Sequence, residues 1–457
     1  MLVSIIYADG EFMTFLLSGF SVAIAGGAVL APVWNHRQEL AIRDGFLVVA
    51  LFWLTLGIAG SIPLLFIADL SPTDAFFEAF SGFTTTGAAV IPHIDDLPKS
   101  ILYHRQQLQW LGGMGVIVLA VAILPMLGVG GTQLYKAEMS GLSQEEKLTP
   151  RIKDTARALW LIYLGLTVAC AISYGLAGMT AFDAIAHAFT TVATGGFSTH
   201  DASIGHFDSP TIELIGIVFM VLGAINFSLH FLAVRHRSFR GYLKDPELKV
   251  FFAIIATSTL LIAAALSSQD IYPSALANLR YSLFQTVSII TTTGYGTAVF
   301  ADWPLYAPLL LASIAFIGGC VASTAGGMKV IRLVVLFLQG VSESRRLIHP
   351  RAVIPMRFGN NAISPEVVRS VWGFYSLFVV TALILTMAMM ALGLDLETAF
   401  GATVASLTLL GPGLGDVAVS FASMSDAVKW LAVFGMLVGR LEVFTLLVLF
   451  TPAFWRR

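Results

Sequence analysis

The stretch Thr291-Thr292-Thr293-Gly294-Tyr295-Gly296 decides how this chain folds, because it is short, polar and rich in glycine between two long hydrophobic segments. Similar stretches occur at 84–89 (TTTGAA) and 192–197 (VATGGF), and a weaker one at 408–413 (TLLGPG). Their glycines are separated by 108, 99 and 117 residues: Gly87, Gly195, Gly294 and Gly411. A motif that recurs at a nearly constant interval indicates an internal repeat, here of four units.

The composition indicates a polytopic membrane protein. Of the 457 residues, 57% are hydrophobic and 12% are charged, and the mean hydropathy is +0.82, whereas a soluble domain averages about 25% charged residues. A spanning helix needs about 20 apolar residues. The candidate spans are 12–33, 44–68, 106–131, 155–178, 210–234, 250–268, 304–340, 366–392 and 427–451.

Four shorter segments cannot span a membrane, and each ends at one of the glycine stretches: 73–83, 181–191, 275–290 and 395–407. Residues that cap or open helices precede them, namely Ser71, Thr180, Ser274 and Asp395. The repeating unit is therefore a spanning helix, a short helix, a glycine loop and a second spanning helix. Irregular backbone at membrane depth persists only where protein buries it or water reaches it. We expect the four loops to converge on one cavity; the alternative is that each is simply a tight turn.

The distribution of charge predicts the orientation. Lys and Arg gather in the connectors between units and at the chain end: Lys136, Lys147, Arg151, Lys153, Arg157, Arg235, Arg237, Arg240, Lys244, Lys249, Arg345, Arg346, Arg351, Arg357, Arg456 and Arg457. Acidic residues follow the glycine loops instead: Asp95, Asp96, Asp201, Asp208, Asp302 and Asp416. Basic connectors stay cytoplasmic, so the loops open to the outside. There the carboxylates either concentrate cations or only keep the loops solvated.

The loops carry the chemistry of a cation site. A dehydrated cation needs a cage of oxygens, and rings of backbone carbonyls provide one. Glycine permits the turn that this requires, and the C-terminal end of each short helix carries a partial negative charge. Loops with mostly uncharged residues favour a monovalent ion. The candidate ligands are Thr85, Thr86, Gly87, Ala193, Thr194, Gly195, Thr292, Thr293, Gly294, Leu409, Leu410 and Gly411.

Together with these loops, three further stretches resemble the Trk/Ktr/HKT superfamily of potassium transporters, TrkH type, over about residues 44–457: 109–115 (QWLGGMG), 318–329 (GGCVASTAGGMK) and 439–445 (GRLEVFT). The resemblance implies an all-α polytopic membrane protein with four M1–pore helix–M2 repeats around a single pore, usually a homodimer. One glycine per repeat, here Gly87, Gly195, Gly294 and Gly411, would mark a potassium-selective filter. We expect an N-terminal extra helix region over 1–43 and repeats over 44–135, 136–240, 241–345 and 346–457.

The resemblance also implies a bacterial inner membrane location, K⁺ as the transported ion, no cofactor in this chain, and a cytoplasmic nucleotide-binding regulatory subunit of the RCK type (TrkA-like). Two features depart from the family pattern. Leu409 and Leu410 replace the polar or small residues of the other loops, which makes the site asymmetric. One complete helix candidate (12–33) stands where the family has two, which would fit a truncated start.

A gate is predicted in the second spanning helix of the third unit. Gly318-Gly319 and Gly326-Gly327 interrupt the apolar run 305–338 and bracket a small, polar stretch that includes Cys320, Ser323 and Thr324. Because glycine is about 1 kcal/mol worse than alanine in a helix, a loop below the filter explains the run better than a straight helix. The resemblance assigns this segment to an intramembrane gating loop. Close packing of the glycines against a neighbouring helix is the alternative, and the order of residues excludes a nucleotide-binding P-loop.

Charged residues near this loop are further gate candidates. Arg440 lies in an apolar run with Glu442 close by, and an ionisable group at such a place is by default functional or paired. We expect Arg440 to act as a barrier or to anchor the loop, and the resemblance implies contact with the gating region. Lys329 either adds a positive element or extends to the headgroups. His187 and His230 are interpreted as packed or interfacial residues rather than ligands.

The sequence is compatible with two functions. One is potassium uptake through a channel-like, gated pore, and the other is a symporter that couples K⁺ to H⁺ or Na⁺. An enzyme is disfavoured, since the sequence has no His, Asp, Glu and Cys cluster at ligand spacing and no nucleophile with a base. Cys170 and Cys320 indicate neither a disulfide framework nor a thiolate metal site. Nothing in the sequence points to a nucleic acid partner.

Overall fold

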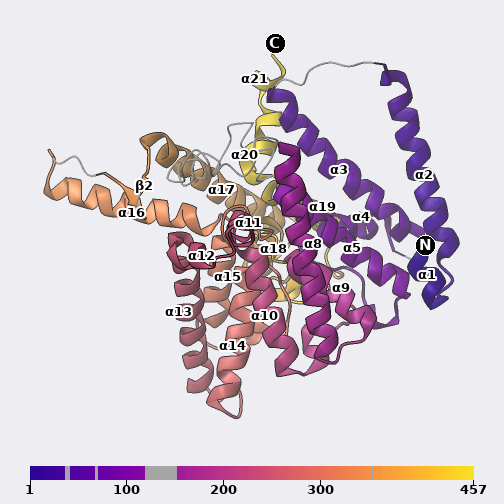
Figure 1. Cartoon of the computed structure of the whole chain (residues 1–457), viewed down its shortest axis with the longest axis horizontal. Helices are drawn as coiled ribbons and strands as arrows, with labels where there is room; N and C mark the ends of the chain where they lie inside the picture. Colours follow the sequence, from indigo (N-terminus) through magenta and orange to yellow (C-terminus); the bar gives the residue numbers. More distant parts are fainter. Residues whose placement is uncertain (36–41, 67–69, 119–151, 352–354, 360, 457) are drawn as a thin grey trace.

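The computed structural model describes residues 1–35, 42–66, 70–118, 152–351, 355–359 and 361–456, and nearly all regular structure in them is helical (Figure 1). The exception in these ranges is a pair of two-residue antiparallel strands, β1 (Arg357–Phe358) and β2 (Asn361–Ala362). Among the described helices, five are long and apolar enough to cross a membrane, or up to seven if each bent pair counts as one span. The predicted all-α polytopic membrane class is confirmed.

Long helices form where apolar runs were predicted. They are α2 (Phe12–Leu30), α3 (Ile42–Phe66), α8 (Ile152–Leu176), α13 (Pro246–Ser268) and α17 (Pro365–Ala391). The short α1 (Leu2–Tyr7) precedes α2, and the 3-10 turn η1 (Ala31–Val33) follows it. In Figure 1, α2 lies at one edge of the molecule. The other four long helices each begin one of the helix–loop–helix units.

The predicted short helices are also present: α4 (Pro72–Phe83), α9 (Ala181–Val192), α14 (Ala275–Ile290) and α18 (Leu396–Leu407). The hydroxyls of Ser71, Thr180 and Ser274 each accept a backbone N–H three residues further on, at 3.1 Å. The carboxylate of Asp395 accepts from the N–H of Thr398 at 3.3 Å. These caps satisfy amide groups that a helix start leaves unpaired. Each short helix packs against the long helix that precedes it.

The second helices of the units are mostly broken. The first, α5 (Lys99–Val118), is continuous as far as it is described; the predicted extension to 131 and the basic residues Lys136, Lys147 and Arg151 lie outside the described residues. In the third unit, α15 (Ala307–Ile317) and α16 (Val330–Ile348) flank the predicted interruption. Figure 1 shows α16 projecting from the body at the edge opposite α2.

The predictions of continuous helices over 210–234 and 427–451 are wrong. In the second unit, α10 (Pro210–Ala224) and α11 (Phe227–His236) meet at 95°. In the fourth, α19 (Asp426–Arg440) and α20 (Glu442–Leu447), followed by η8 (Val448–Phe450), meet at 108°. The cause at the first bend is Asn226, whose side chain caps α11 by accepting the N–H of Ser228 at 2.9 Å. At the second bend, Glu442 has a left-handed φ of 53°.

Short elements complete the chain between these helices. They are η2 (Ile94–Asp96), η5 (Ser203–Phe207), α12 (Arg240–Lys244), η6 (Phe300–Asp302), η7 (Gly415–Val417) and α21 (Pro452–Trp455).

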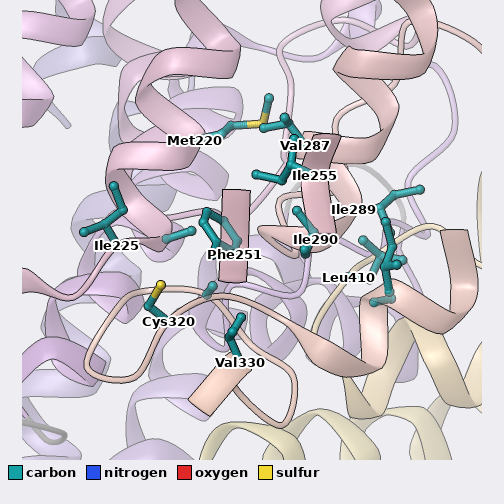
Figure 2. Packing of buried hydrophobic residues seen from close by; sticks show 14 of the residues in the cluster. Met220, Ile225, Phe251, Ile255, Val287, Ile289, Ile290, Cys320, Val330 and Leu410 are labelled. Carbon is teal, nitrogen blue, oxygen red and sulfur yellow. The ribbon is translucent and has the colours of Figure 1, made fainter. Parts of the chain in front are cut away.

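Among the described residues, two large apolar clusters form most of the core. One is built mainly from the second and third units and the other mainly from the first and fourth. Figure 2 shows part of the first cluster, in which Phe251 of α13, Cys320 of the broken segment and Val330 of α16 share one apolar environment with Ile290 and Leu410. Because Ile290 ends a short helix and Leu410 belongs to the fourth loop, the core reaches the places where the loops meet.

Ion pairs join neighbouring units at their edges. Lys429 of α19 bonds Asp74 of α4, and Arg280 of α14 bonds Glu213 of α10, both at 2.6 Å. Arg332 of α16 bonds Glu442 at 2.8 Å. These contacts connect the fourth unit with the first, the third with the second, and the third with the fourth.

Candidate functional site: four converging loops and an inserted segment

The four loops share one backbone conformation. In each, two residues with left-handed φ are separated by one residue: Thr85 and Gly87, Thr194 and Gly196, Thr292 and Gly294, Leu409 and Gly411. The glycines among them have φ between 77° and 93°. Glycine adopts this conformation at no steric cost, while other residues are strained there. The same turn therefore follows the C-terminal end of each of the four short helices.

This conformation corrects the register of the second loop. The glycine equivalent to Gly87, Gly294 and Gly411 is Gly196, whereas the sequence pattern selected Gly195. Hydrogen bonds agree, since the amides of Thr86, Gly195, Thr293 and Leu410 donate to the carbonyls of Ser81, Thr190, Ser288 and Ala405 at 2.8–3.0 Å. Gly195 thus takes the place of a threonine. The adjacent glycines of Thr194-Gly195-Gly196 made both alignments compatible with the sequence.

The loops close into a ring. A Cβ atom on Gly87 would lie under 3.0 Å from the carbonyl oxygen of Gly195, a separation that real Cβ atoms essentially never show. The same holds for Gly196 against Thr293, Gly294 against Leu410, and Gly411 against Thr86. Each loop thus places the carbonyl of one residue in the space that the missing side chain of its neighbour leaves. The contacts run from the first loop to the second, third and fourth, and back to the first.

The predicted ligand residues are brought together and buried. Thr85, Thr86, Ala193, Thr194, Thr292, Thr293, Leu409 and Leu410 each have a relative exposure of at most 1%. Several hydroxyls already have partners: Thr84 with Thr86 at 2.7 Å, and Thr291 with Thr293 at 2.8 Å. The oxygens common to all four loops are therefore those of the backbone, since Leu409 and Leu410 bring none of their own.

Gln109 of α5 supports the second loop, and sequence reasoning did not select it. Its side-chain amide donates to the carbonyl of Gly195 at 2.6 Å and accepts the N–H of Phe197 at 3.1 Å. Gln109 lies in the stretch 109–115, and a buried amide in an apolar helix was the available signal. It links the second helix of the first unit to the loop of the second.

A cavity of about 400 Å³ adjoins the loops and is lined by residues from all four, including Gly87, Gly196, Gly294 and Pro412. Its wall continues along the segments that follow the glycines, through His200 and Val419. Arg105 also reaches this wall; it is 1% exposed and pairs with the buried Glu78 at 2.6 Å. The cavity therefore lies beyond the glycines, in the direction of the acidic loop residues.

The segment 318–329, between α15 and α16, contacts residues of the ring that come just before the left-handed glycine of their loop. The hydroxyl of Thr324 donates to the carbonyl of Gly223 at 2.9 Å and accepts from the hydroxyl of Thr194 at 3.1 Å. The N–H of Gly326 donates to the hydroxyl of Thr292 at 2.6 Å, and that of Gly327 to the carbonyl of Thr408 at 3.2 Å. One loop thus touches the second, third and fourth loops of the ring.

The bend between α10 and α11 makes room for this segment. The N–H of Cys320 donates to the carbonyl of Ala224 at 2.9 Å, and the N–H of Phe227 donates to the carbonyl of Ala322 at 3.0 Å. Ser323 donates to the carbonyl of Cys320 at 2.6 Å. Gly318 and Gly319 approach neighbouring backbone so closely that a Cβ on either would meet it. The backbone groups freed by the bend are thus satisfied by the inserted segment.

Arg440 anchors the segment from the fourth unit. Its guanidinium donates to the carbonyl of Thr324 at 3.0 Å and to the carbonyl of Gly112 at 3.5 Å, and it is 5% exposed. Glu442, expected beside Arg440, bonds Arg332 instead, because the bend at residue 441 turns α20 away. The ammonium of Lys329 donates to the carbonyl of Ala325 within the same segment.

Glu247 joins the start of the segment to the first turn of α16, and sequence reasoning missed it. Its carboxylate accepts the N–H of Val321 at 3.0 Å and the N–H of Ile331 at 3.1 Å, and it is 2% exposed. An acidic residue in the first turn of α13 normally suggests only a helix start. Its distant partners become visible only in the folded chain.

The two histidines interpreted as packed residues are so. Both ring nitrogens of His187 have partners, the carbonyl of Asp183 and the hydroxyl of Ser198, each at 2.9 Å. His230 contacts the carbonyl of Leu222 at 2.9 Å and the hydroxyl of Tyr242 at 2.6 Å.

Known proteins resemble this chain over its whole length. The TrkH family, described as cation transport proteins, matches residues 12–457. The Trk system potassium uptake protein TrkH of Vibrio parahaemolyticus is 52% identical over 460 residues, which cover 100% of this chain and 95% of the relative. The TrkH protein of Escherichia coli K12 is 51% identical over 458 residues with the same coverage. The TrkG protein of that strain is 37% identical and covers 100% of this chain and 94% of its own.

A solved structure agrees. The crystal structure of the potassium transporter TrkH from Vibrio parahaemolyticus superposes with a TM-score of 0.92 at 50% sequence identity, over 100% of this chain and 95% of that chain. The chain therefore belongs to the TrkH family of cation transport proteins.

Proposed function

We propose that this protein mediates potassium uptake through a channel-like pore whose selectivity filter is the ring of four loops. The observation that carries the proposal is the closed ring, in which each unit contributes a carbonyl that only a neighbouring glycine can accommodate. Backbone carbonyls from four sides can replace the hydration shell of a monovalent cation. Relatives named potassium uptake proteins match the whole chain, which supports K⁺ as the ion.

The segment 318–329 serves as an intramembrane gate in this proposal. It contacts three loops of the ring, and Arg440 places a positive charge next to the segment, at the carbonyl of Thr324. A cation leaving the ring in that direction meets a closed peptide segment and a guanidinium. Opening in this proposal requires the contacts of Thr324, Gly326 and Gly327 to break.

The protein functions in the bacterial inner membrane with the cavity facing outward. The basic residues of the connectors favour the cytoplasmic side for the opposite face. We further propose that it works as a homodimer with a cytoplasmic nucleotide-binding RCK-type subunit of the TrkA kind. The relatives' description as parts of a Trk system supports a partner of this sort.

Flux from liposomes that contain the purified protein alone tests this function. We expect K⁺ and Rb⁺ to pass faster than Na⁺ and Li⁺, with a reversal potential that follows the K⁺ gradient. A reversal potential that moves with imposed H⁺ or Na⁺ gradients would instead establish the symporter alternative. Equal passage of all four ions would refute the filter.

The register correction predicts a difference between two adjacent glycines. Gly196→Ala should reduce K⁺ flux far more than Gly195→Ala, because alanine at 196 meets the backbone of Thr293 in a left-handed conformation. At 195 the obstacle is the end of the Gln109 side chain, which yields more readily than backbone does. The left-handed strain alone costs about 1–3 kcal/mol. Rubidium uptake into vesicles with equal protein content measures the difference, and a more severe effect at 195 would contradict the register.

A further inference from the structure

Three metal-ligating side chains meet beside the cavity, on segments that follow the first and second loops. Asp95 lies in η2, His200 follows the second loop, and His206 lies in η5. Each offers one ligand atom, and these atoms all lie within 4.8 Å of one another. The Oδ1 of Asp95 and the Nδ1 of His200 are 2.5 Å apart, and the rings of His200 and His206 stack with centroids 3.5 Å apart.

We propose that Asp95, His200 and His206 bind a divalent transition-metal ion, with Zn²⁺ the best fit, and that the bound ion lowers potassium entry. Two imidazoles and one carboxylate suit Zn²⁺, Ni²⁺ and Cu²⁺, whereas Ca²⁺ and Mg²⁺ prefer sets of oxygen ligands. Three protein ligands leave a fourth position for water. The ion takes the place of the hydrogen bond between Asp95 and His200.

The surroundings of His200 fit a metal ligand. If Nδ1 coordinates the ion, the opposite nitrogen, Nε2, keeps its proton and faces the Oδ1 of Asp183 at 3.6 Å. Thr180 and Thr199 donate to the Asp183 carboxylate at 2.6 and 2.7 Å, which fixes its position. A carboxylate behind a ligating histidine sets the tautomer and increases the basicity of the ligand. Asp183 is thus close enough to accept a hydrogen bond from Nε2 after a small shift of the His200 ring.

The remaining ligands can adjust. His206 and Asp95 are exposed, so the His206 ring can turn out of the parallel stack and direct its nitrogen to the ion. The backbone around Asp95 and His200 is already joined. The N–H of Asp201 donates to Asp95 at 3.2 Å, and the N–H of Ile94 donates to Asp201 at 2.9 Å. Binding therefore needs side-chain rotation rather than loop movement.

An effect on transport follows from the location and rests on the proposed function. His200 lines the cavity that is also lined by Gly87, Gly196 and Gly294. A divalent charge there opposes the entry of K⁺ within about 8 Å, the screening length at physiological ionic strength. Zn²⁺ added from the outer side should therefore reduce K⁺ influx in a saturable way.

Direct binding tests the site without any transport measurement. Titration of the chelator-treated, full-length protein with Zn²⁺ by calorimetry should show one saturable site per chain. His206→Ala and Asp95→Asn should each weaken it on the order of tenfold or more, since even second-shell changes cost 10–100-fold. His93→Ala is the matched control, because His93 is exposed two residues from Asp95 and outside the cluster; it should bind as wild type does.

Absence of a saturable site in wild type, or unchanged binding by both cluster variants, would overturn the proposal. Comparing the thermal unfolding of each variant with that of wild type separates lost ligands from a lost fold, and Asp95→Asn remains decisive if His206→Ala unfolds. In liposomes, external Zn²⁺ should lower K⁺ influx through wild type and His93→Ala but not through His206→Ala. Binding without any effect on flux would refute the transport half. A protein that conducts no K⁺ but binds Zn²⁺ would refute the proposed function and leave the site intact.

Discussion

Gly87→Ser should lower the selectivity for K⁺ over Na⁺ by about tenfold, equivalent to about 1.4 kcal/mol. A side chain at position 87 meets the carbonyl oxygen of Gly195 at under 3.0 Å, in a backbone conformation with φ of 84°. Because the obstacle is backbone, it can yield only by moving the second loop away from the first. In the proposed filter, widening one side of the ring removes a carbonyl from the position that would compensate for the dehydration of K⁺.

Relative permeabilities from bi-ionic potentials, recorded in liposomes or planar bilayers, measure this effect. Gly393→Ser is the matched control, because Gly393 has a φ of 100° with nothing within 4 Å of an added Cβ. It shares the conformational strain without the clash, so its selectivity should equal that of wild type. Unchanged selectivity in Gly87→Ser, with both variants folded, would contradict the assignment of the ring as the filter.

Removal of residues 320–325 should raise the basal K⁺ flux of the purified protein alone. The deletion takes away the contacts that Cys320 and Thr324 make with the second unit. The glycine pairs on either side of the deletion give the backbone enough freedom to connect α15 with α16 through the shortened segment. Rubidium influx into vesicles of equal protein content measures the change. An unaltered or abolished flux in a well-expressed deletion would count against a gate.

Arg440→Met should raise the basal flux in the same direction by about tenfold, because hydrogen bonds to charged groups contribute about 1.5–3 kcal/mol and 1.4 kcal/mol corresponds to tenfold. The substitution keeps most of the side-chain volume but removes the bonds to Thr324 and Gly112. Arg346→Met serves as the control, since Arg346 is half exposed and pairs only with Glu343 of its own helix in the described structure. Equal flux in the two variants would show that Arg440 does not hold the segment.

The membrane class and the helix–loop–helix units could be predicted because they depend on local sequence. Apolar length determines which helices can cross a bilayer, and Ser71, Thr180, Ser274 and Asp395 cap the short helices as their sequence positions predicted. The interruption at 318–329 was also visible, since glycine pairs weaken a helix wherever they occur. The function of the loops as a filter stays a prediction, as do the repeat boundaries.

The bends at residues 225 and 441 could not be predicted from apolar length, which is the same for a straight and a bent helix. At the first bend, the carbonyl of Ala224 and the N–H of Phe227 have no partner within their helices. They bond instead to the backbone of Cys320 and Ala322, about 100 residues away in the chain. At the second, the turn sends Glu442 to Arg332 rather than to Arg440. Partners of this kind exist only after the units have assembled.

Four glycine-containing turns after four short helices in an apolar chain could be predicted from the sequence, because caps, glycines and hydrophobic length act locally. The assembled fold was needed to show which glycine of the second loop is equivalent to the others, and that Gln109 and Glu247 support distant backbone. The physical reason is that the ring is a set of contacts between units. Whether Gly195 or Gly196 must lack a side chain depends on where the carbonyl of Thr293 lies, and the third unit places that oxygen.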